Sequence, residues 1–315
     1  MEYVNVQGLD QPVSRLILGS GGLSPNNMDY VRTMLEAYRK LGGNTVDLAY
    51  IYGGGACERA IGLWLAENGR DAIHVWTKGA HHDQNGPRVN KQAIYEELME
   101  SLERLQTDYV DLYALHRDDP SVPVGEILEA LNEHIEAGRM KAIGASNWTH
   151  RRLQEAGEYA ASHGLTGFAF SSPNLSLAKT NEPYWADCVS ADEEMCAWHE
   201  RTQLPLFSWS SQARGFFSGR FSPEDRSNAD MVRVFYNDGN WERLRRAERM
   251  AAEKGVTPIQ LSLAYVLNQP FPAAALIGPA NIAELQSCYE ASQIRLSREE
   301  LRWLDLSDGT HQTSA

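Results

Sequence analysis

The feature of this sequence that most limits its fold is a regular alternation of short apolar segments with segments of helical period. Eight of the short segments are rich in β-branched and other apolar residues, a composition that favours β-strands. They lie at residues 16–18, 45–46, 73–77, 110–115, 141–145, 167–170, 204–208 and 273–277. Strands that alternate with helices form a parallel sheet, and a strand that is apolar along its whole length fits a sheet buried on both faces.

The segments between these strands carry helix signals. At residues 60–65, 94–105 and 127–135, apolar residues recur with helical spacing and leave charged residues on the opposite face. Thr257–Gln260 and Ser297–Glu300 have the composition of capping boxes, so two helices are predicted to begin there. Because residues 258–267 are apolar nearly all round, we expect this helix to be covered by other elements.

A closed barrel and an open doubly wound sheet both fit this alternation. The open sheet would need an early phosphate-binding GxGxxG motif, but the GSGG at residues 19–22 lacks that register and a helix start. We therefore predict an α/β fold, a (β/α)8 TIM barrel with an N-terminal β-hairpin at its base. Two long rim loops are expected, at residues 172–190 and 209–240. No break in composition divides the chain, which predicts a single domain over residues 1–315.

The overall composition excludes several partners. The net charge is −13 and no basic stretch occurs, which argues against a nucleic-acid surface. No run of 18 apolar residues and no signal-peptide pattern is present, so no membrane partner is expected. The four cysteines form neither a CxxC pair nor a dense framework, which is typical of reduced thiols. These features predict a cytoplasmic location.

Four polar residues lie at or just past the ends of successive predicted strands. They are Asp47, Tyr52, Lys78 and His116. In a barrel of parallel strands all C-terminal ends meet at one rim, so residues far apart in sequence share one pocket. There a lysine can lower the pKa of a tyrosine, a carboxylate can hold the lysine, and an imidazole can orient a carbonyl. Such a set can move a proton.

Five segments, taken in order, resemble the aldo-keto reductase superfamily. They are DLAYIYGGGACERAIG, WTKG, LHRDDP, GRMKAIGASNW and WSSQARGFFSG, and the resemblance runs from about Val13 to Leu306. It implies a (β/α)8 barrel that binds NAD(P)H without a Rossmann domain. It also implies hydride transfer to the carbonyl of an aldehyde, ketone or sugar, or the reverse, with Asp47, Tyr52, Lys78 and His116 as catalytic residues. Tyr52 would be the general acid or base.

The resemblance also implies a set of cofactor contacts. Ser146 and Asn147 match the pair that binds the nicotinamide carboxamide, and Ser172 stands where the family has a glutamine for the same amide. Trp209 takes the place of a tyrosine that stacks on the nicotinamide. The expected cofactor-binding residues are Ser146, Asn147, Ser172, Trp209, Ser210, Gln212, Arg214, Gly215, Gly278, Ala280, Asn281 and Glu284.

The segment GPANIAELQSC bears on cofactor preference. It contains no lysine or arginine, and Glu284 falls where the family's NADP-selecting arginine aligns. A carboxylate there would repel the 2′-phosphate of NADP but could accept hydrogen bonds from ribose hydroxyls. We therefore expect use of NAD(H), or of NAD(H) and NADP(H) alike.

The substrate is expected to be a small carbonyl compound or alcohol, and we expect Tyr50, His82, Trp148 and Trp185 to line its pocket. Two other functions remain open. One is a non-enzymatic regulatory barrel that binds the dinucleotide, although the complete set of four residues favours an enzyme. The other is a metal-dependent barrel hydrolase, suggested by His81 and His82. Adjacent residues rarely aim both rings at one ion and no further ligand cluster accompanies them, so no metal site is expected.

Overall fold

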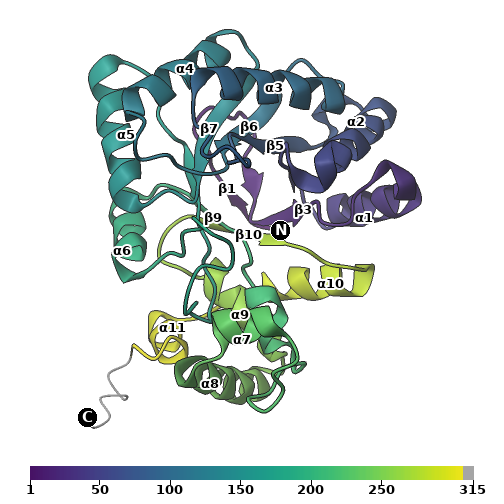
Figure 1. The fold of residues 1–315 in the computed structure, drawn as a ribbon. Coiled ribbons are helices and arrows are strands. Elements are labelled where there is room, and N and C mark those ends of the chain that lie inside the picture. The colour runs from purple at the N-terminus through teal and green to yellow at the C-terminus, as the bar shows by residue number, and fades with distance from the viewer. Residues whose placement is uncertain (308–315) are drawn as a thin grey trace.

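Eight parallel strands close into a barrel in the order β10-β3-β4-β5-β6-β7-β8-β9, with the helices around it (Figure 1). The computed structural model describes residues 1–307, so residues 308–315, the end of the predicted domain, lie outside the described residues. The barrel strands are β3 (Leu16–Gly19), β4 (Thr45–Asp47), β5 (His74–Gly79), β6 (Val110–Leu115), β7 (Met140–Ser146), β8 (Phe170–Ser172), β9 (Leu206–Ser208) and β10 (Ala273–Ile277). The predicted (β/α)8 barrel is confirmed.

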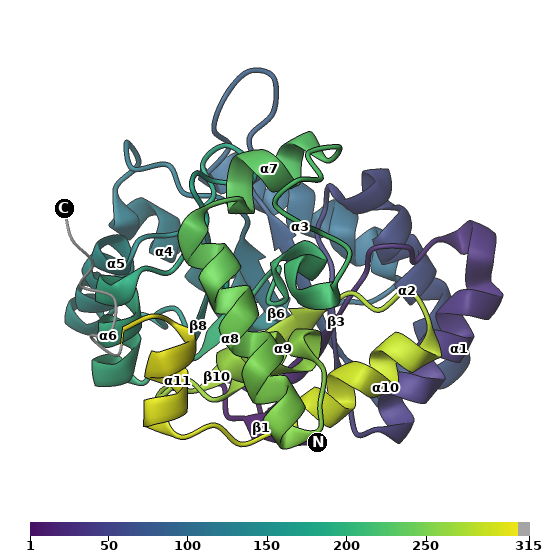
Figure 2. The same cartoon turned by 90° about the horizontal axis from the view of Figure 1, so that it is seen from below.

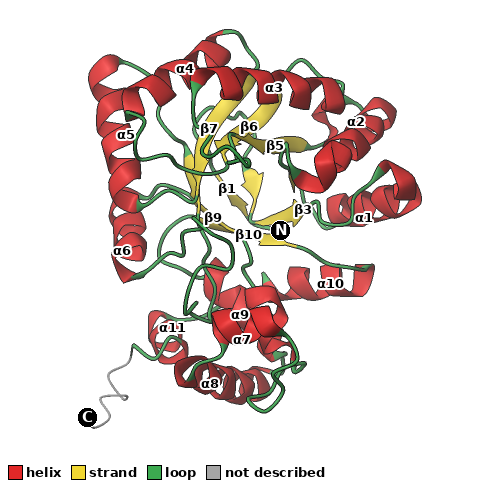
Figure 3. Cartoon of the chain, viewed as in Figure 1, coloured by secondary structure: helices red, strands yellow, loops and turns green. Residues whose placement is uncertain are grey.

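Helices surround the strands on all sides (Figure 3). The α-helices are α1 (Met28–Lys40), α2 (Ala56–Asn68), α3 (Lys91–Leu105), α4 (Val124–Glu136), α5 (His150–His163), α6 (Glu193–Thr202), α7 (Ala229–Phe235), α8 (Asp238–Lys254), α9 (Pro258–Leu267), α10 (Ile282–Ala291) and α11 (Arg298–Leu304). Short 3-10 helices are η1 (Pro25–Asn27), η2 (Tyr52–Gly55), η3 (Arg70–Ala72) and η4 (Ala213–Ser218). Both predicted capping boxes form, at the starts of α9 and α11.

Helix α9 is covered, as its apolar composition predicts. Its residues Gln260–Leu267 are all buried. It packs against β10 on one side, while α8 and α10 contact it elsewhere, and α8 crosses beside it in the view from below (Figure 2). The apolar surface of α9 is therefore shared between the barrel wall and the outer helices.

The N-terminal hairpin, β1 (Tyr3–Val4) paired with β2 (Val13–Ser14), lies across one end of the barrel (Figure 1). Buried Val4, Val6 and Val13 belong to one apolar cluster with the barrel-interior side chains of Trp76 and Phe207. The hairpin therefore covers the base, and the opposite end, where the strands finish, is left for a site.

One of the two long rim loops differs from its predicted extent. Residues 173–192 connect β8 to α6, as expected, but the segment predicted as a loop to residue 240 contains η4, α7 and the first turn of α8. Asn228 and Asn237 each accept a hydrogen bond from a backbone N–H three residues later, which begins α7 and α8. These caps outweigh the aromatic and glycine content that favoured a loop.

Within residues 1–307, no helix has both the length and the hydropathy needed to cross a membrane. The expected cytoplasmic location and the single domain over residues 1–315 stay predictions.

A buried carboxylate at the base of the barrel links strands β5, β6 and β7. Asp111 accepts hydrogen bonds from Arg70 Nη2 (2.7 Å), Lys141 Nζ (2.9 Å) and the N–H of Val75 (2.9 Å). Burial alone would raise the pKa of Asp111, but hydrogen bonding from His74 and the charge of Arg70 outweigh it and hold this pKa well below its usual range. The stabilisation is therefore fully present above the unfolded pKa of about 3.9 and is lost as the pH falls below it.

We predict that Asp111→Asn lowers the free energy of unfolding at pH 7 by about 2–3 kcal/mol, because it removes an acceptor bound to charged groups. At pH 3 the difference from the wild type should be smaller by about 1 kcal/mol, since the wild-type carboxylate then gives up part of its contribution. Urea denaturation at both pH values measures this. Asp29→Asn, at a fully exposed side chain of α1, is the control. An equal loss of unfolding free energy in Asp111→Asn at both pH values would contradict the lowered pKa of Asp111.

Candidate active site

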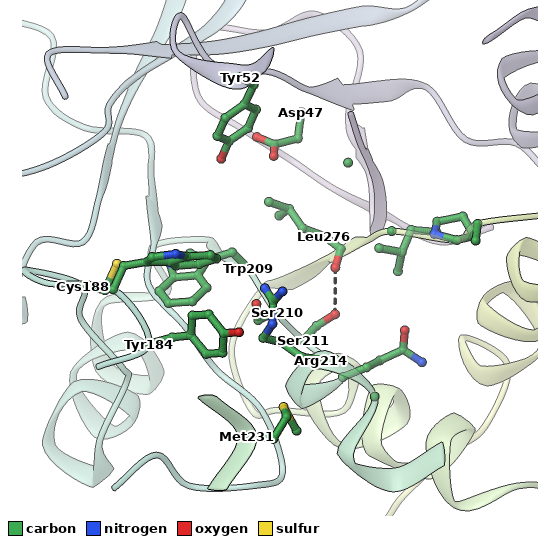
Figure 4. Close-up of a pocket in the computed structure, with 18 of the residues that line it drawn as sticks. Asp47, Tyr52, Tyr184, Cys188, Trp209, Ser210, Ser211, Arg214, Met231 and Leu276 are labelled. Atoms are coloured by element: carbon green, nitrogen blue, oxygen red, sulfur yellow. Dashed lines mark hydrogen bonds between the residues drawn. The ribbon is translucent and has the colours of Figure 1, made fainter. Parts of the chain in front are cut away.

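The four polar residues predicted to act together line one cavity of about 1600 Å³ where the barrel strands end. Asp47 is the last residue of β4, and Lys78 is the last but one of neighbouring β5. His116 directly follows β6, and Tyr52 begins η2. Figure 4 shows Asp47 and Tyr52 on one side of this cavity, opposite Trp209. The structure therefore brings together residues up to 69 positions apart, as the barrel fold requires.

The turn after β4 fixes the position of Tyr52. A backbone hydrogen bond from Tyr50 N–H to the Lys78 carbonyl (2.8 Å) ties the turn to β5, and one from Tyr52 N–H to the Ala49 carbonyl (3.0 Å) closes the turn itself. Three glycines with left-handed φ values follow, and at Gly55 a Cβ would lie 2.6 Å from the Arg104 guanidinium. The glycines thus let the chain reverse directly after Tyr52 and enter α2.

Lys78 is the centre of the polar set. Its Nζ donates to the Asp47 carboxylate, to the Leu48 carbonyl (2.8 Å) and to Tyr52 Oη (3.4 Å). Burial opposes the charge on Lys78, but the Asp47 carboxylate outweighs burial and raises the lysine pKa. A fixed ammonium therefore faces the phenol oxygen.

Burial and a nearby charge act in opposite directions on the acidity of Tyr52. Burial raises the pKa of Tyr52 above its ordinary value, and the nearby Lys78 charge offsets only part of this increase. Lys78 thus lowers the pKa of Tyr52, as expected from the sequence for a lysine at this place, but burial of the phenol has the larger effect. At neutral pH the side chain is a phenol, which is the form that donates a proton.

The ring of His116 lies beside Tyr52. Its side chain is buried, and Nδ1 has no hydrogen-bond partner among residues 1–307. The ring meets that of Tyr52 edge-on, with centroids 5.5 Å apart. Burial, together with the charge of Lys78, holds the pKa of His116 well below its usual value. The imidazole is therefore neutral at physiological pH and can take part in a hydrogen bond with a bound oxygen.

Two of the three residues predicted to bind the nicotinamide amide line the cavity. Ser146 and Asn147 do so, and each is held from behind: Ser146 Oγ donates to the Ser172 carbonyl (2.9 Å), and Asn147 Nδ2 donates to the His116 carbonyl (3.1 Å). Ser172 does not line the cavity; its buried Oγ has no hydrogen-bond partner among the described residues. The Ser172 side chain therefore does not lie at the cavity, where it was expected to contact the nicotinamide amide.

The segment after β9 makes a curved wall. Trp209, Ser210, Gln212, Arg214 and Gly215 all line the cavity, as predicted (Figure 4). Arg214 (φ 52°) and Gly215 (φ 86°) have left-handed backbones, and successive turns of this kind turn backbone N–H groups toward an anion. The Arg214 guanidinium lies 4.3 Å above the centroid of the Tyr184 ring. The Gly215 N–H itself donates to the Gln212 carbonyl (2.9 Å), so binding of the pyrophosphate at this wall stays a prediction.

The start of α10 closes the far end of the cavity. Gly278, Ala280 and Glu284 line it, whereas Asn281 does not and instead caps the helix by accepting from the Glu284 N–H (2.9 Å). Glu284 Oε2 accepts a hydrogen bond from the Ala280 N–H (2.8 Å). The Ala280 N–H, which could otherwise donate to a phosphate at the start of α10, is therefore already bound to a carboxylate.

Two of the four predicted substrate contacts lie at the cavity. His82 and Trp185 line it, but Tyr50 and Trp148 do not, which corrects their assignment. Tyr50 Oη donates to Glu100 (2.7 Å) on α3, so its ring faces that helix. Trp148 is almost fully buried and donates from Nε1 to the Arg117 carbonyl (3.2 Å). Both side chains are held by partners outside the cavity.

The structure adds Arg117 and Cys188 to the wall. Arg117 directly follows His116 in the segment LHRDDP, so the same strand-end reasoning that identified His116 could have found it. Cys188 lies in the loop after β8, and nothing in its local sequence distinguishes it from the cysteines that only pack.

A metal-dependent hydrolase gains no support from the geometry. In residues 1–307 no group of three or more His, Cys, Asp or Glu side chains is placed to hold a metal ion. The His81 and His82 rings lie against each other, 4.2 Å between centroids, and His81 Nδ1 is 2.8 Å from the His82 carbonyl oxygen. His81 Nδ1 therefore has a hydrogen-bond partner within the pair, and the geometry gives no sign that both rings bind one ion.

Comparisons with known proteins agree with this geometry. The model of the Aldo/keto reductase family matches residues 15–307. The chain is 28% identical over 320 residues to aldo-keto reductase YhdN of Bacillus subtilis, covering 95% of this chain and 91% of the relative. It is 28% identical over 285 residues to norsolorinic acid reductase of Aspergillus flavus, covering 86% and 70%. It is also 27% identical to a probable voltage-gated potassium channel subunit beta of Oryza sativa, covering 88% and 87%.

Solved structures share the fold. A thermostable aldo-keto reductase in complex with the inhibitor epalrestat aligns with a TM-score of 0.76 and 23% identity, covering 98% of this chain and all of that one. A glycerol dehydrogenase of Gluconobacter oxydans aligns with the same TM-score and identity, covering 97% and 94%.

Proposed function

The chain belongs to the aldo/keto reductase family and is an NAD(P)H-dependent oxidoreductase, and we propose that Tyr52 is the general acid with which it reduces the carbonyl of an aldehyde, ketone or sugar. The same residue would act as general base when an alcohol is oxidised. The observation that carries this proposal is the contact of Tyr52 Oη with Lys78 Nζ (3.4 Å), itself ion-paired with Asp47, on the cavity wall beside His116.

The proposed mechanism assigns one task to each side chain. When bound, the reduced nicotinamide supplies the hydride that the carbonyl carbon accepts. Negative charge then develops on the carbonyl oxygen, and Tyr52 Oη donates its proton to that oxygen. The Lys78 ammonium stabilises the phenolate left behind, and Asp47 keeps that ammonium in place. His116 would donate a hydrogen bond to the same oxygen and so polarise the carbonyl.

The raised pKa of Tyr52 favours the reductive direction. Reduction needs the phenol, which burial maintains at neutral pH. Oxidation of an alcohol needs the phenolate as base, a form that becomes abundant only at higher pH. We therefore propose that alcohol oxidation becomes faster as the pH rises, whereas reduction has its proton donor at pH 7.

Residues along the cavity would hold the dinucleotide. Ser146 and Asn147 offer polar groups for the carboxamide, and Trp209, whose buried Nε1 has no hydrogen-bond partner among the described residues, offers a ring for the nicotinamide to stack on. The turns that carry Ser210, Gln212 and Gly215 would follow the pyrophosphate. The start of α10 would meet the adenosine ribose.

A non-enzymatic role is the second candidate, because one relative is named a probable potassium channel subunit beta. Against it, all four polar residues that proton transfer requires lie on one wall here. Turnover of any carbonyl that depends on Tyr52 separates the two functions.

Tyr52→Phe should lower kcat by about 10²–10⁴-fold, the usual contribution of a general acid, while the Kd for the dinucleotide stays close to that of the wild type. NAD(P)H absorbance with a panel of aldehydes, ketones and sugars measures kcat, and titration of tryptophan fluorescence measures Kd. Tyr50→Phe removes the same hydroxyl two residues away, outside the cavity, and should keep its activity. A Tyr52→Phe variant with half the wild-type kcat would remove Tyr52 from the mechanism.

The charge at the start of α10 bears on cofactor preference. Because Glu284 occupies the start of α10 and would repel a 2′-phosphate, kcat/KM with NADH should be at least comparable to that with NADPH. Glu284→Arg should shift the ratio toward NADPH, whereas the same charge reversal at Glu299, an exposed residue of α11 outside the cavity, should not. A wild-type preference for NADPH above about 100-fold, or ~2.7 kcal/mol, would contradict this reading of Glu284.

A further inference from the structure

Arg117 is a buried cation without a carboxylate partner. Only 7% of the residue is exposed, and it lines the cavity next to His116. Within residues 1–307 its side chain makes one hydrogen bond, from Nη1 to the His116 carbonyl (2.9 Å), and no ion pair. Its Nε is buried with no acceptor. Most of the donors of this guanidinium are therefore unused.

Other arginines with little exposure in this chain are compensated. Arg104 forms ion pairs with Glu58 and Glu100, and Arg152 forms ion pairs with Asp118 (3.3 Å) and Glu155. Burying a charge without a partner is costly, so such groups normally have one. Arg117 departs from this pattern at a cavity wall, where a ligand can supply the missing anion.

Two of the acidic groups near Arg117 are already engaged, and the third, Asp187, which lines a small side pocket with Arg117, forms no ion pair with it in the described structure. Asp118, the next residue, is turned toward Arg152, and Asp47 is paired with Lys78. Lys78 therefore adds no net charge to this end of the cavity.

Two histidines that line the cavity, His81 and His116, add no charge either. Burial, together with the positive charge of Arg117, lowers the pKa of His81, and His116 is neutral for similar reasons. Arg117 thus lies among neutral and paired groups and is itself a cation without an ion pair in the described structure.

We propose that Arg117 binds the carboxylate of the substrate, so that the preferred substrates are carbonyl compounds that also carry a carboxylate group. A guanidinium presents paired N–H donors that match the two oxygens of a carboxylate. This inference rests on the proposed function, because it concerns the substrate of the same cavity.

The competing interpretation is structural. Arg117 and Asn147 both donate to the His116 carbonyl, so Arg117 would then serve only to hold the residues after β6. A structural role would affect charged and neutral substrates equally. A carboxylate-binding role would affect the ratio between them.

The test uses matched substrates that differ only in the carboxylate: 4-carboxybenzaldehyde with methyl 4-formylbenzoate, and 4-oxobutanoate with its methyl ester. The quantity measured is kcat/KM for each acid divided by that for its ester. We expect the wild type to favour the acids in at least one pair. Arg117→Gln should reduce that ratio by about 10–100-fold, as expected when a hydrogen bond between charged groups is lost. Arg117→Lys, which keeps the charge without the fork, should retain part of it.

The control is Arg151→Gln, the same loss of charge at an exposed residue of α5, which should leave the ratio unchanged. An equal fall in kcat/KM for acid and ester in Arg117→Gln would overturn the inference and leave Arg117 a structural contact. So would a wild type that prefers neither acid, a result that needs no variant to fold.

Failure of the proposed function gives a different result. If the wild type reduces neither these compounds nor any carbonyl of the wider panel, Tyr52 loses its proposed role, and calorimetric binding of 4-carboxybenzaldehyde and its ester to the cofactor-loaded protein still decides about Arg117. Tighter binding of the acid that is lost in Arg117→Gln would support the inference. Equal binding of acid and ester by the wild type would overturn it.

Discussion

The site depends on the buried ion pair between Asp47 and Lys78, on neighbouring strands β4 and β5. Neither side chain can lie in an apolar interior alone, since an unpaired buried charge costs several kcal/mol. Together with the hydrogen bond from Lys78 to the Leu48 carbonyl, the pair fixes one ammonium beneath Tyr52. The β4–β5 register places the pair at the end of the strands that carries the cavity. The glycine turn brings Tyr52 to the same end, and the hairpin covers the opposite end of the barrel.

The cavity distributes its charge along its length. At the Tyr52 end, Lys78 is paired with Asp47, and His81 and His116 are neutral, whereas Arg117 has no ion pair among the described residues. At the other end, Glu284 accepts the Ala280 N–H and makes the start of α10 acidic. A dinucleotide that lies between these ends would meet a carboxylate at its adenosine ribose, and a substrate would meet a guanidinium beside the reacting carbonyl.

The sequence predicts the barrel and the residues at its strand ends. The alternation of strands and helices indicates a parallel barrel, and in such a barrel all C-terminal strand ends share one rim. The sequence predicts less well where neighbouring side chains point. Tyr50 turns to Glu100 and Trp148 packs inward, since each finds a partner that lies far away in the sequence. Ser172 also lies away from the cavity, although its Oγ has no hydrogen-bond partner among the described residues. The net rise in the pKa of Tyr52 depends on burial in the folded chain, which a list of nearby charges does not include.

The measurement that tests the account most directly is the pH dependence of kcat/KM for alcohol oxidation in Lys78→Met. Removing the ammonium raises the pKa of Tyr52 further, so the variant should be active only toward higher pH than the wild type. Lys179→Met breaks an ion pair with Asp305 outside the cavity and should leave the profile in place. A Lys78→Met profile equal to that of the wild type, with full activity, would contradict the claim that this lysine controls proton transfer by Tyr52.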